Sequence, residues 1–149
     1  MAAGTFKWFG AAASHLADAD IDWVADTINC SLHTSSYTPD QDAHDYANDL
    51  TNEIASGGGY TTGGAALANK TIDYAAASNT ARLRADDIVW SNSTITNARV
   101  AVLRKVRGGA SSADELIGYC IFDGDVSSSS GTFTIDLDAT NGVLTLVAS

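Results

Sequence analysis

The chain has 149 residues, a length typical of a single domain. Its 18 acidic residues outnumber its 8 basic residues and give a formal net charge of -10. Nucleic acids and anionic membranes are bound through clustered lysine and arginine, so this balance argues against both as partners. Charged residues make up only 17% of the chain, and the small polar residues that replace them favour short strands and tight turns.

Cys30 and Cys120 are the only cysteines, and each lies in an apolar, strand-like run. They do not form a Cys-x-x-Cys motif, so we expect no zinc site and two buried free thiols. A disulfide between Cys30 and Cys120 is possible only if the two strands that carry them are neighbours. The first residues carry no basic segment before a long apolar run, so we expect no secretory signal, synthesis in the cytoplasm and a soluble chain.

The N-terminal run of residues 5–9 is strongly aromatic. Two interpretations remain open: an edge strand of the core, or an arm within residues 1–20 that packs on a neighbouring molecule. The alanine-rich residues 11–19 predict a short helix. The acidic residues 18–26 lack the central Gly and distal Glu of a calcium-binding loop, so we expect a solvated turn with a buried Trp23.

Residues 27–34 alternate apolar and polar side chains, which predicts a half-buried strand. In such a strand Cys30 and Leu32 face the core, and His33 falls on the wetter face. Residues 41–50 favour a helical turn. Within it, His44 is expected at the surface because no nucleophile motif accompanies it.

Five glycines of residues 57–64 surround Tyr60. The stretch is not a Walker-type phosphate loop, because Ala-Ala-Leu follows Gly64 where that loop has Lys and Ser or Thr. It is not a dinucleotide fingerprint either, because a strand-like run follows at residues 71–74 where that motif has a helix. We therefore expect a turn between β-segments, with Tyr60 buried and residues 57–59 near a surface or a subunit contact.

Short β-type runs continue to the C-terminus. Strands are predicted at residues 65–75, 80–85, 88–90, 98–106, 116–122, 132–138 and 143–147, with turns at 76–79 and 123–125 and a terminal hairpin at Asn141-Gly142. The runs at 98–106 and 116–122 are apolar on both faces, as central strands are. The chain is therefore predicted to be mainly β: a single antiparallel β-sandwich of residues 1–149, jelly-roll-like, with a short N-terminal helical segment and a small helical content that lies before residue 55.

The sequence carries no nucleophile elbow, metal-binding histidine pair, Cys-His dyad or phosphate loop. Two acidic pairs, Asp123 with Asp125 and Asp136 with Asp138, would suit a glycoside-cleaving enzyme if they faced one cleft. Such a cleft also needs several aromatic side chains, and the 3 Trp, 5 Tyr and 4 Phe must fill the core as well. We expect no catalytic residue, no bound metal and no cofactor, and therefore no enzyme.

The order of several short motifs resembles a family of small structural proteins of tailed bacteriophages. The motifs are Asp22-Trp23, Thr27-Ile28, Tyr37-Thr38-Pro39, Glu53-Ile54-Ala55, Gly59-Tyr60-Thr61-Thr62-Gly63-Gly64, Leu67, Thr71-Ile72-Asp73-Tyr74, Asp86 to Trp90 and Leu116-Ile117-Gly118-Tyr119. The resemblance covers residues 21–147. Gly57-Gly58 make the glycine turn longer than in the family pattern.

The resemblance implies a non-enzymatic structural protein of a virion, synthesised in the host cytoplasm. Within the particle we expect a capsid decoration or cement protein on the capsid surface. Such a protein binds the shell of the major capsid protein, or other virion proteins, as a homo-oligomer, with a trimer favoured. Open alternatives are a tail, neck or fibre-head component and a carbohydrate-binding β-sandwich module.

The residues expected at an interface come from the aromatic N-terminal run, the glycine turn and a basic segment. The basic segment would pair with acids of a partner chain or lie on a solvated face. The candidate interface residues are Phe6, Trp8, Phe9, Gly57, Gly58, Gly59, Arg104, Lys105 and Arg107.

Overall fold

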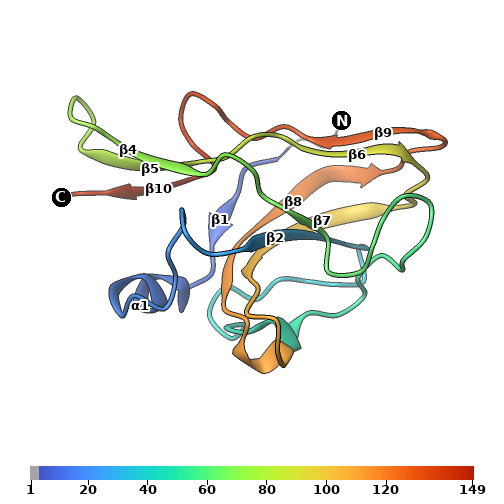
Figure 1. Cartoon of the computed structure of the whole chain (residues 1–149), viewed down its shortest axis with the longest axis horizontal. Helices are drawn as coiled ribbons and strands as arrows, with labels where there is room; N and C mark the ends of the chain where they lie inside the picture. Colours follow the sequence, from blue (N-terminus) through green and yellow to red (C-terminus); the bar gives the residue numbers. More distant parts are fainter. Residues whose placement is uncertain (1–3) are drawn as a thin grey trace.

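The computed structural model describes residues 4–149, which form two packed layers of antiparallel β-strands (Figure 1). The strands are β1 (Lys7–Trp8), β2 (Ile28–His33), β3 (Ala65–Ala66), β4 (Thr71–Ala75), β5 (Thr80–Arg84), β6 (Ile88–Ser93), β7 (Ala98–Lys105), β8 (Leu116–Val126), β9 (Gly131–Ile135) and β10 (Leu144–Val147). A short helix, α1 (Ala12–Ala17), and two 3-10 turns, η1 (Ala47–Asp49) and η2 (Ser111–Ala113), lie between them. In this part of the chain, no helix is long and apolar enough to cross a membrane.

The larger layer is a five-stranded sheet with the order β1-β8-β7-β2-β3. Its centre is formed by β7 and β8, which carry apolar side chains on both faces. On β7, Val100 and Val102 point to one face while Ala101 and Leu103 point to the other, and all four are buried. A sheet of this kind needs a covering on each side.

The opposite layer supplies the first covering. It contains the three-stranded sheet β10-β5-β4 and the two-stranded sheet β6-β9. Between the layers, Trp90 packs edge-on against Phe133 with 5.8 Å between the ring centroids. Leu32 and Phe122 reach the same core from the five-stranded sheet. Burial of such aromatic and aliphatic side chains is the main source of stability.

The segment between β2 and β3 and the end of β1 cover the other face of the five-stranded sheet. Phe9 and Tyr37 pack there against Val102 and Tyr119, with the Phe9 and Tyr119 ring centroids 4.8 Å apart. Because of this second covering, His33 is fully buried. The prediction that His33 lies on the wetter face of its strand is therefore wrong.

The predicted mainly-β fold, with antiparallel sheets and a short N-terminal helix, is confirmed. Trp23 is buried as predicted, and η1 provides the expected helical turn. Cys30 and Cys120 are free and buried, because β7 separates the strands that carry them. η2 lies well after residue 55, so the prediction that the helical content lies before that residue is wrong for this one turn.

Three features of the predicted strand and turn pattern are wrong. β8 continues through residues 123–125, where the sequence predicts a turn, since Val126 still pairs with β7. The predicted strand at 65–75 is two strands, because Asn69, with φ of 50°, turns the chain out of the five-stranded sheet. The Asn-Gly turn at 141–142 closes no hairpin, because β9 pairs with β6 whereas β10 pairs with β5.

Candidate functional site

The aromatic N-terminal run lies along an edge of the five-stranded sheet. β1 pairs with β8 through Lys7 and Trp8, which is the edge-strand arrangement that the sequence left open beside an arm. Residues 1–3 of the expected arm lie outside the described residues. Phe9 is fully buried, so its side chain is occupied within the chain. Phe6 and Trp8 are half-buried and line a cleft.

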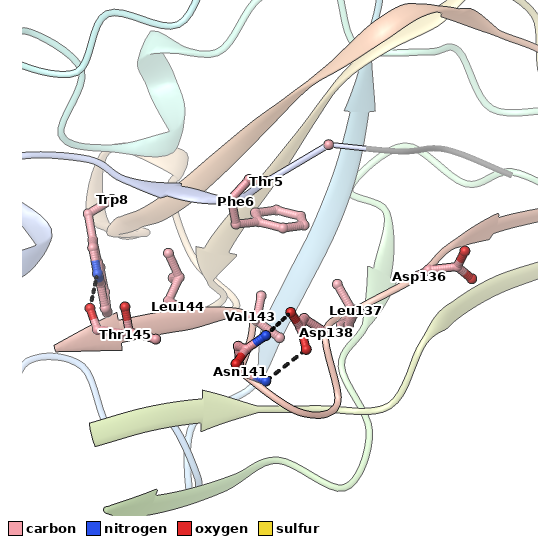
Figure 2. A pocket seen from close by; sticks show the side chains of 12 residues that line it. Thr5, Phe6, Trp8, Asp136, Leu137, Asp138, Asn141, Val143, Leu144 and Thr145 are labelled. Carbon is pink, nitrogen blue, oxygen red and sulfur yellow. Dashed lines mark hydrogen bonds between the residues drawn. The ribbon is translucent and has the colours of Figure 1, made fainter. Parts of the chain in front are cut away.

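Figure 2 shows this cleft, of about 330 Å³, between β1 and the segment that joins β9 to β10. The ring of Phe6 forms one wall and faces Val143 and Leu137 across the space. The indole of Trp8 closes one end, where its Nε1–H donates to the carbonyl oxygen of Thr145 at 2.9 Å. The walls formed by Phe6, Leu137 and Val143 are therefore apolar and suit the face of a ring or an apolar side chain, while polar side chains line the rest of the cleft.

Acidic and amide groups line the rim of the cleft. Asp138 Oδ1 accepts the backbone N–H groups of Thr140 at 2.9 Å and Asn141 at 2.7 Å, and its Oδ2 accepts Asn141 Nδ2 at 2.9 Å. These hydrogen bonds hold the pKa of Asp138 below its usual range. The general acid of a glycosidase needs a raised pKa, so Asp138 is suited to holding the turn. The carboxylate of Asp136 points outward (Figure 2).

The glycine stretch is a tight turn that packs against the end of β6. Gly57 and Tyr60 exchange two backbone hydrogen bonds, at 2.9 and 3.0 Å. A Cβ on Gly58 would lie 2.4 Å from Thr94 O, whereas a Cβ on Gly57 would meet nothing within 4 Å. Gly57, Gly58 and Gly59 are exposed, so their predicted place at the surface is confirmed.

Tyr60 anchors this turn, and its predicted burial is confirmed at 2% exposure. Its hydroxyl accepts the backbone N–H of Leu32 at 2.9 Å and donates to Glu53 Oε1 at 2.7 Å. The same carboxylate oxygen accepts the N–H of Gly63 at 2.5 Å. Burial raises the pKa of Tyr60, so the hydroxyl keeps its proton. The signature that carries the family resemblance therefore holds the fold of this segment.

The basic segment around the end of β7 forms ion pairs within the chain. The pairs are Arg104 with Asp114 at 3.0 Å, Lys105 with Asp26 at 2.9 Å and Arg107 with Glu115 at 2.5 Å. Asp114 and Glu115 are each 4% exposed, so their arginine partners neutralise buried charge. The three basic side chains expected at an interface are thus used inside the molecule.

One grouping among residues 4–149 has the composition of a metal site. It consists of His15, Asp20 and Glu115, whose ligand atoms lie within 4.8 Å of one another. The guanidinium of Arg107 already contacts both carboxylate oxygens of Glu115, at 2.5 and 3.1 Å. Burial raises the pKa of Glu115, but this fork outweighs burial and leaves the pKa below its usual value. Arg107 supplies the positive charge, so the grouping is an ion-pair network.

Ser31 and His33 form a buried polar pair that the sequence reasoning missed. Ser31 Oγ lies 2.9 Å from His33 Nε2, and His33 Nδ1 donates to Thr51 O at 2.8 Å. Burial lowers the pKa of His33, so the ring is neutral and Nε2 accepts the Ser31 hydroxyl. Both residues are 0% exposed, so the pair is enclosed beneath the segment that covers this face of the sheet. The sequence signal for this pair is the spacing of two residues, which places both side chains on the same face of β2.

The sheet β10-β5-β4 lies at one end of the molecule (Figure 1). Several of its apolar side chains are exposed. Its register places Ile72 in a row with Leu83 and Leu144, and Tyr74 in the next row with Leu146, on the same face. Leu83 and Leu144 are buried in the core, but Ile72, Tyr74 and Leu146 are 52%, 56% and 41% exposed. These three side chains, which we call the apolar sheet end, continue the core-facing side of the sheet beyond the core.

Comparisons with family models, with curated proteins and with solved structures each found no match to this chain.

Proposed function

We propose that this chain is a non-enzymatic structural protein of a tailed-phage virion. In the particle it acts as a capsid decoration protein that binds the outside of the shell of the major capsid protein. The virion assignment rests on the order of motifs that resembles the phage family. The observation that carries the binding role is the apolar sheet end, exposed on a chain with a net charge of -10.

Apolar side chains gathered on one exposed face are typical of protein–protein contact surfaces. Tyrosine is enriched in the buried centre of such contacts, and Tyr74 supplies one here. The opposite face of the same sheet is mixed: Asp73 accepts hydrogen bonds from Arg82 and Arg84, and the exposed Val147 lies on the same side. The apolar sheet end therefore differs from this face in gathering three exposed apolar side chains without a charged group among them.

The charge distribution supports display at high density. Most basic side chains are tied in ion pairs within the chain, so the field outside the molecule is negative. Like-charged copies repel one another in solution and remain soluble when crowded on a particle. A shell surface that offers apolar, neutral or basic groups is the matching partner.

Co-sedimentation with purified capsid shells tests the binding role. Leu146→Asp places a charge in the apolar sheet end, and we expect at least about a tenfold loss of affinity, because burying an unpaired charge in an interface costs at least ~1.4 kcal/mol. Val89→Asp is the matched control, since Val89 is 50% exposed on β6 and lies outside the apolar sheet end. Shells that bind Leu146→Asp as tightly as wild type, or that do not bind wild type, would refute the role.

A second candidate is a carbohydrate-binding module, and the cleft of Figure 2 favours it. The ring of Phe6 offers a face to the C–H groups of a sugar, and Thr5, Asn141 and Thr145 offer polar groups around it. Titration with a panel of soluble oligosaccharides, followed by NMR, tests this function. Shifts confined to the cleft that disappear in Phe6→Leu would establish it. An unchanged spectrum for every sugar would exclude it for that panel.

A further inference from the structure

The strand β4 forms a free edge of the apolar sheet end. In the order β10-β5-β4, β5 is central and β4 is the outer strand. The other edge is partly covered, because Trp8 Nε1–H donates to Thr145 O on β10. A free edge presents unpaired N–H and C=O groups, and proteins that do not use such an edge usually protect it with charges, proline or a bulge. On one face of β4 lie the exposed apolar residues Ile72 and Tyr74, and the one charged residue of the strand, Asp73, is paired with Arg82 and Arg84 of the neighbouring strand.

The hydrogen-bond pattern shows which groups of β4 are free. Ala148 N–H donates to Asn79 O, which places the odd-numbered residues of β5 in the hydrogen-bonded positions toward β10. The even-numbered residues of β5 therefore bond to β4, where Thr71, Asp73 and Ala75 lie opposite them. It follows that Ile72 and Tyr74 direct their N–H and C=O groups outward.

We propose that β4 pairs with β4 of a second copy of this chain, antiparallel about a two-fold axis that passes through Ile72. The pairing joins two three-stranded sheets into one sheet of six strands. Each copy offers the same surface to the other, as a two-fold contact requires. The free N–H and C=O groups of Ile72 and Tyr74 then become paired, and their side chains lie beside those of the other copy on the same face of the joined sheet.

Charge disfavours one of the registers that hydrogen bonding permits. Centred on Asp73, the pairing would set two carboxylates directly opposite each other, which is destabilising. Centred on Ile72, it sets Ile72 against its twin, Asp73 against Thr71 and Tyr74 against Lys70. Lys70 has no ion pair among residues 4–149, so its ammonium group is free to lie over the tyrosine ring. The register centred on Ile72 thus gives the ammonium group of Lys70 a partner.

The inference deepens the proposed function, because it separates the edge of the sheet from its face. The outer edge of β4, with the backbone groups of Ile72 and Tyr74, is assigned to a second copy. The face that carries the side chains of the apolar sheet end, including Leu146 on β10, stays open for the shell. The two assignments fail separately: a chain that binds shells but does not pair through β4 refutes only the present inference. A chain that pairs but binds no shell refutes only the decoration role.

Engineered cysteines test the pairing and its register in the full chain. Residues opposite each other in a hydrogen-bonded antiparallel pair have Cα atoms about 5.5 Å apart, within the range that a disulfide spans. Under copper-phenanthroline and oxygen, which take up the two electrons and two protons of the thiols, Ile72→Cys is expected to form a covalent dimer of twice 15.4 kDa. The native Cys30 and Cys120 are buried and do not compete.

Val89→Cys, at similar exposure, measures cross-linking by random collision, and Tyr74→Cys tests the register. We expect Ile72→Cys to cross-link at least ~10-fold faster than either, because residues held together in a complex react at a high effective concentration. Cross-linking of Ile72→Cys no faster than that of Val89→Cys would overturn the pairing. Faster cross-linking of Tyr74→Cys would overturn the register on Ile72. Ile72 is 52% exposed, so none of these changes disturbs the core.

Discussion

Removal of a single oxygen atom, in Tyr60→Phe, tests how the glycine turn is held. The ring stays in place against Trp90, with 5.8 Å between the ring centroids in the native protein, so packing is retained. Two hydrogen bonds are lost: the one from the backbone N–H of Leu32 and the one to Glu53 Oε1. Leu32 is 0% exposed, so its N–H group is left without an acceptor in the core.

The expected cost follows from these two losses. A buried donor without a partner costs ~1–3 kcal/mol, and loss of the hydrogen bond to the carboxylate brings the total to ~3 kcal/mol. For a domain of this size that corresponds to a fall in melting temperature of about 6–12 °C. Urea denaturation followed by circular dichroism measures the free energy of unfolding directly.

Tyr119→Phe is the control, because Tyr119 is 8% exposed and no partner of its hydroxyl is seen among the described residues. We expect that control to lie within ~0.5 kcal/mol of wild type. Equal stability of Tyr60→Phe and Tyr119→Phe would show that the two hydrogen bonds of Tyr60 do not hold the turn, and the account of the signature would then be wrong.

Three further predictions concern the fold. Gly64→Ala should lower the free energy of unfolding by ~3 kcal/mol or more, whereas Gly108→Ala, also at positive φ but in open space, should lower it by only ~1 kcal/mol; equal losses would remove the steric argument. Burial holds the pKa of His33 below 6.5, so as the pH falls the histidine of the unfolded chain takes up a proton before that of the folded chain. The free energy of unfolding should therefore fall as the pH drops below 6.5, and His33→Gln should flatten the stability–pH curve there. An unchanged slope in His33→Gln would contradict a buried, neutral His33. Arg104→Met should cost ~3 kcal/mol because it leaves a buried carboxylate without its ion-pair partner, and Arg99→Met, from an exposed pair, at most ~1 kcal/mol; the reverse order in urea denaturation would contradict a stabilising role for the pair of Arg104 with Asp114.

The strands could be predicted because they depend on local pattern. Alternation marked β2, and apolar side chains on both faces marked β7 and β8 as central, as they are. Strand pairing could not be predicted in the same way. The Asn-Gly turn at 141–142 is a genuine tight turn, held by Asp138, but the residues on either side of it enter different sheets. Which strands meet depends on long-range packing, and no local signal carries it.

In the candidate site, too, features set by the local sequence could be predicted and features set by long-range packing could not. Burial of Tyr60 could be predicted, because Tyr60 is the one aromatic side chain among five glycines and so the one that can anchor the turn in the core. The ion pair of Arg104 could not be predicted, because its acidic partner, Asp114, lies across a loop whose path the sequence does not reveal. Exposure of Ile72 and Tyr74 was missed for a related reason: alternation places them on the core-facing side of β4, and only the structure shows that the core ends before it reaches them.

The location of the protein in virions tests the central claim most directly. A labelled antibody or a fusion tag on this chain, imaged on purified particles, reports that location. We expect label spread over the surface of the head and a head that becomes less resistant to heat or low salt when the chain is deleted. Label confined to the tail, or particles that carry no label, would contradict it.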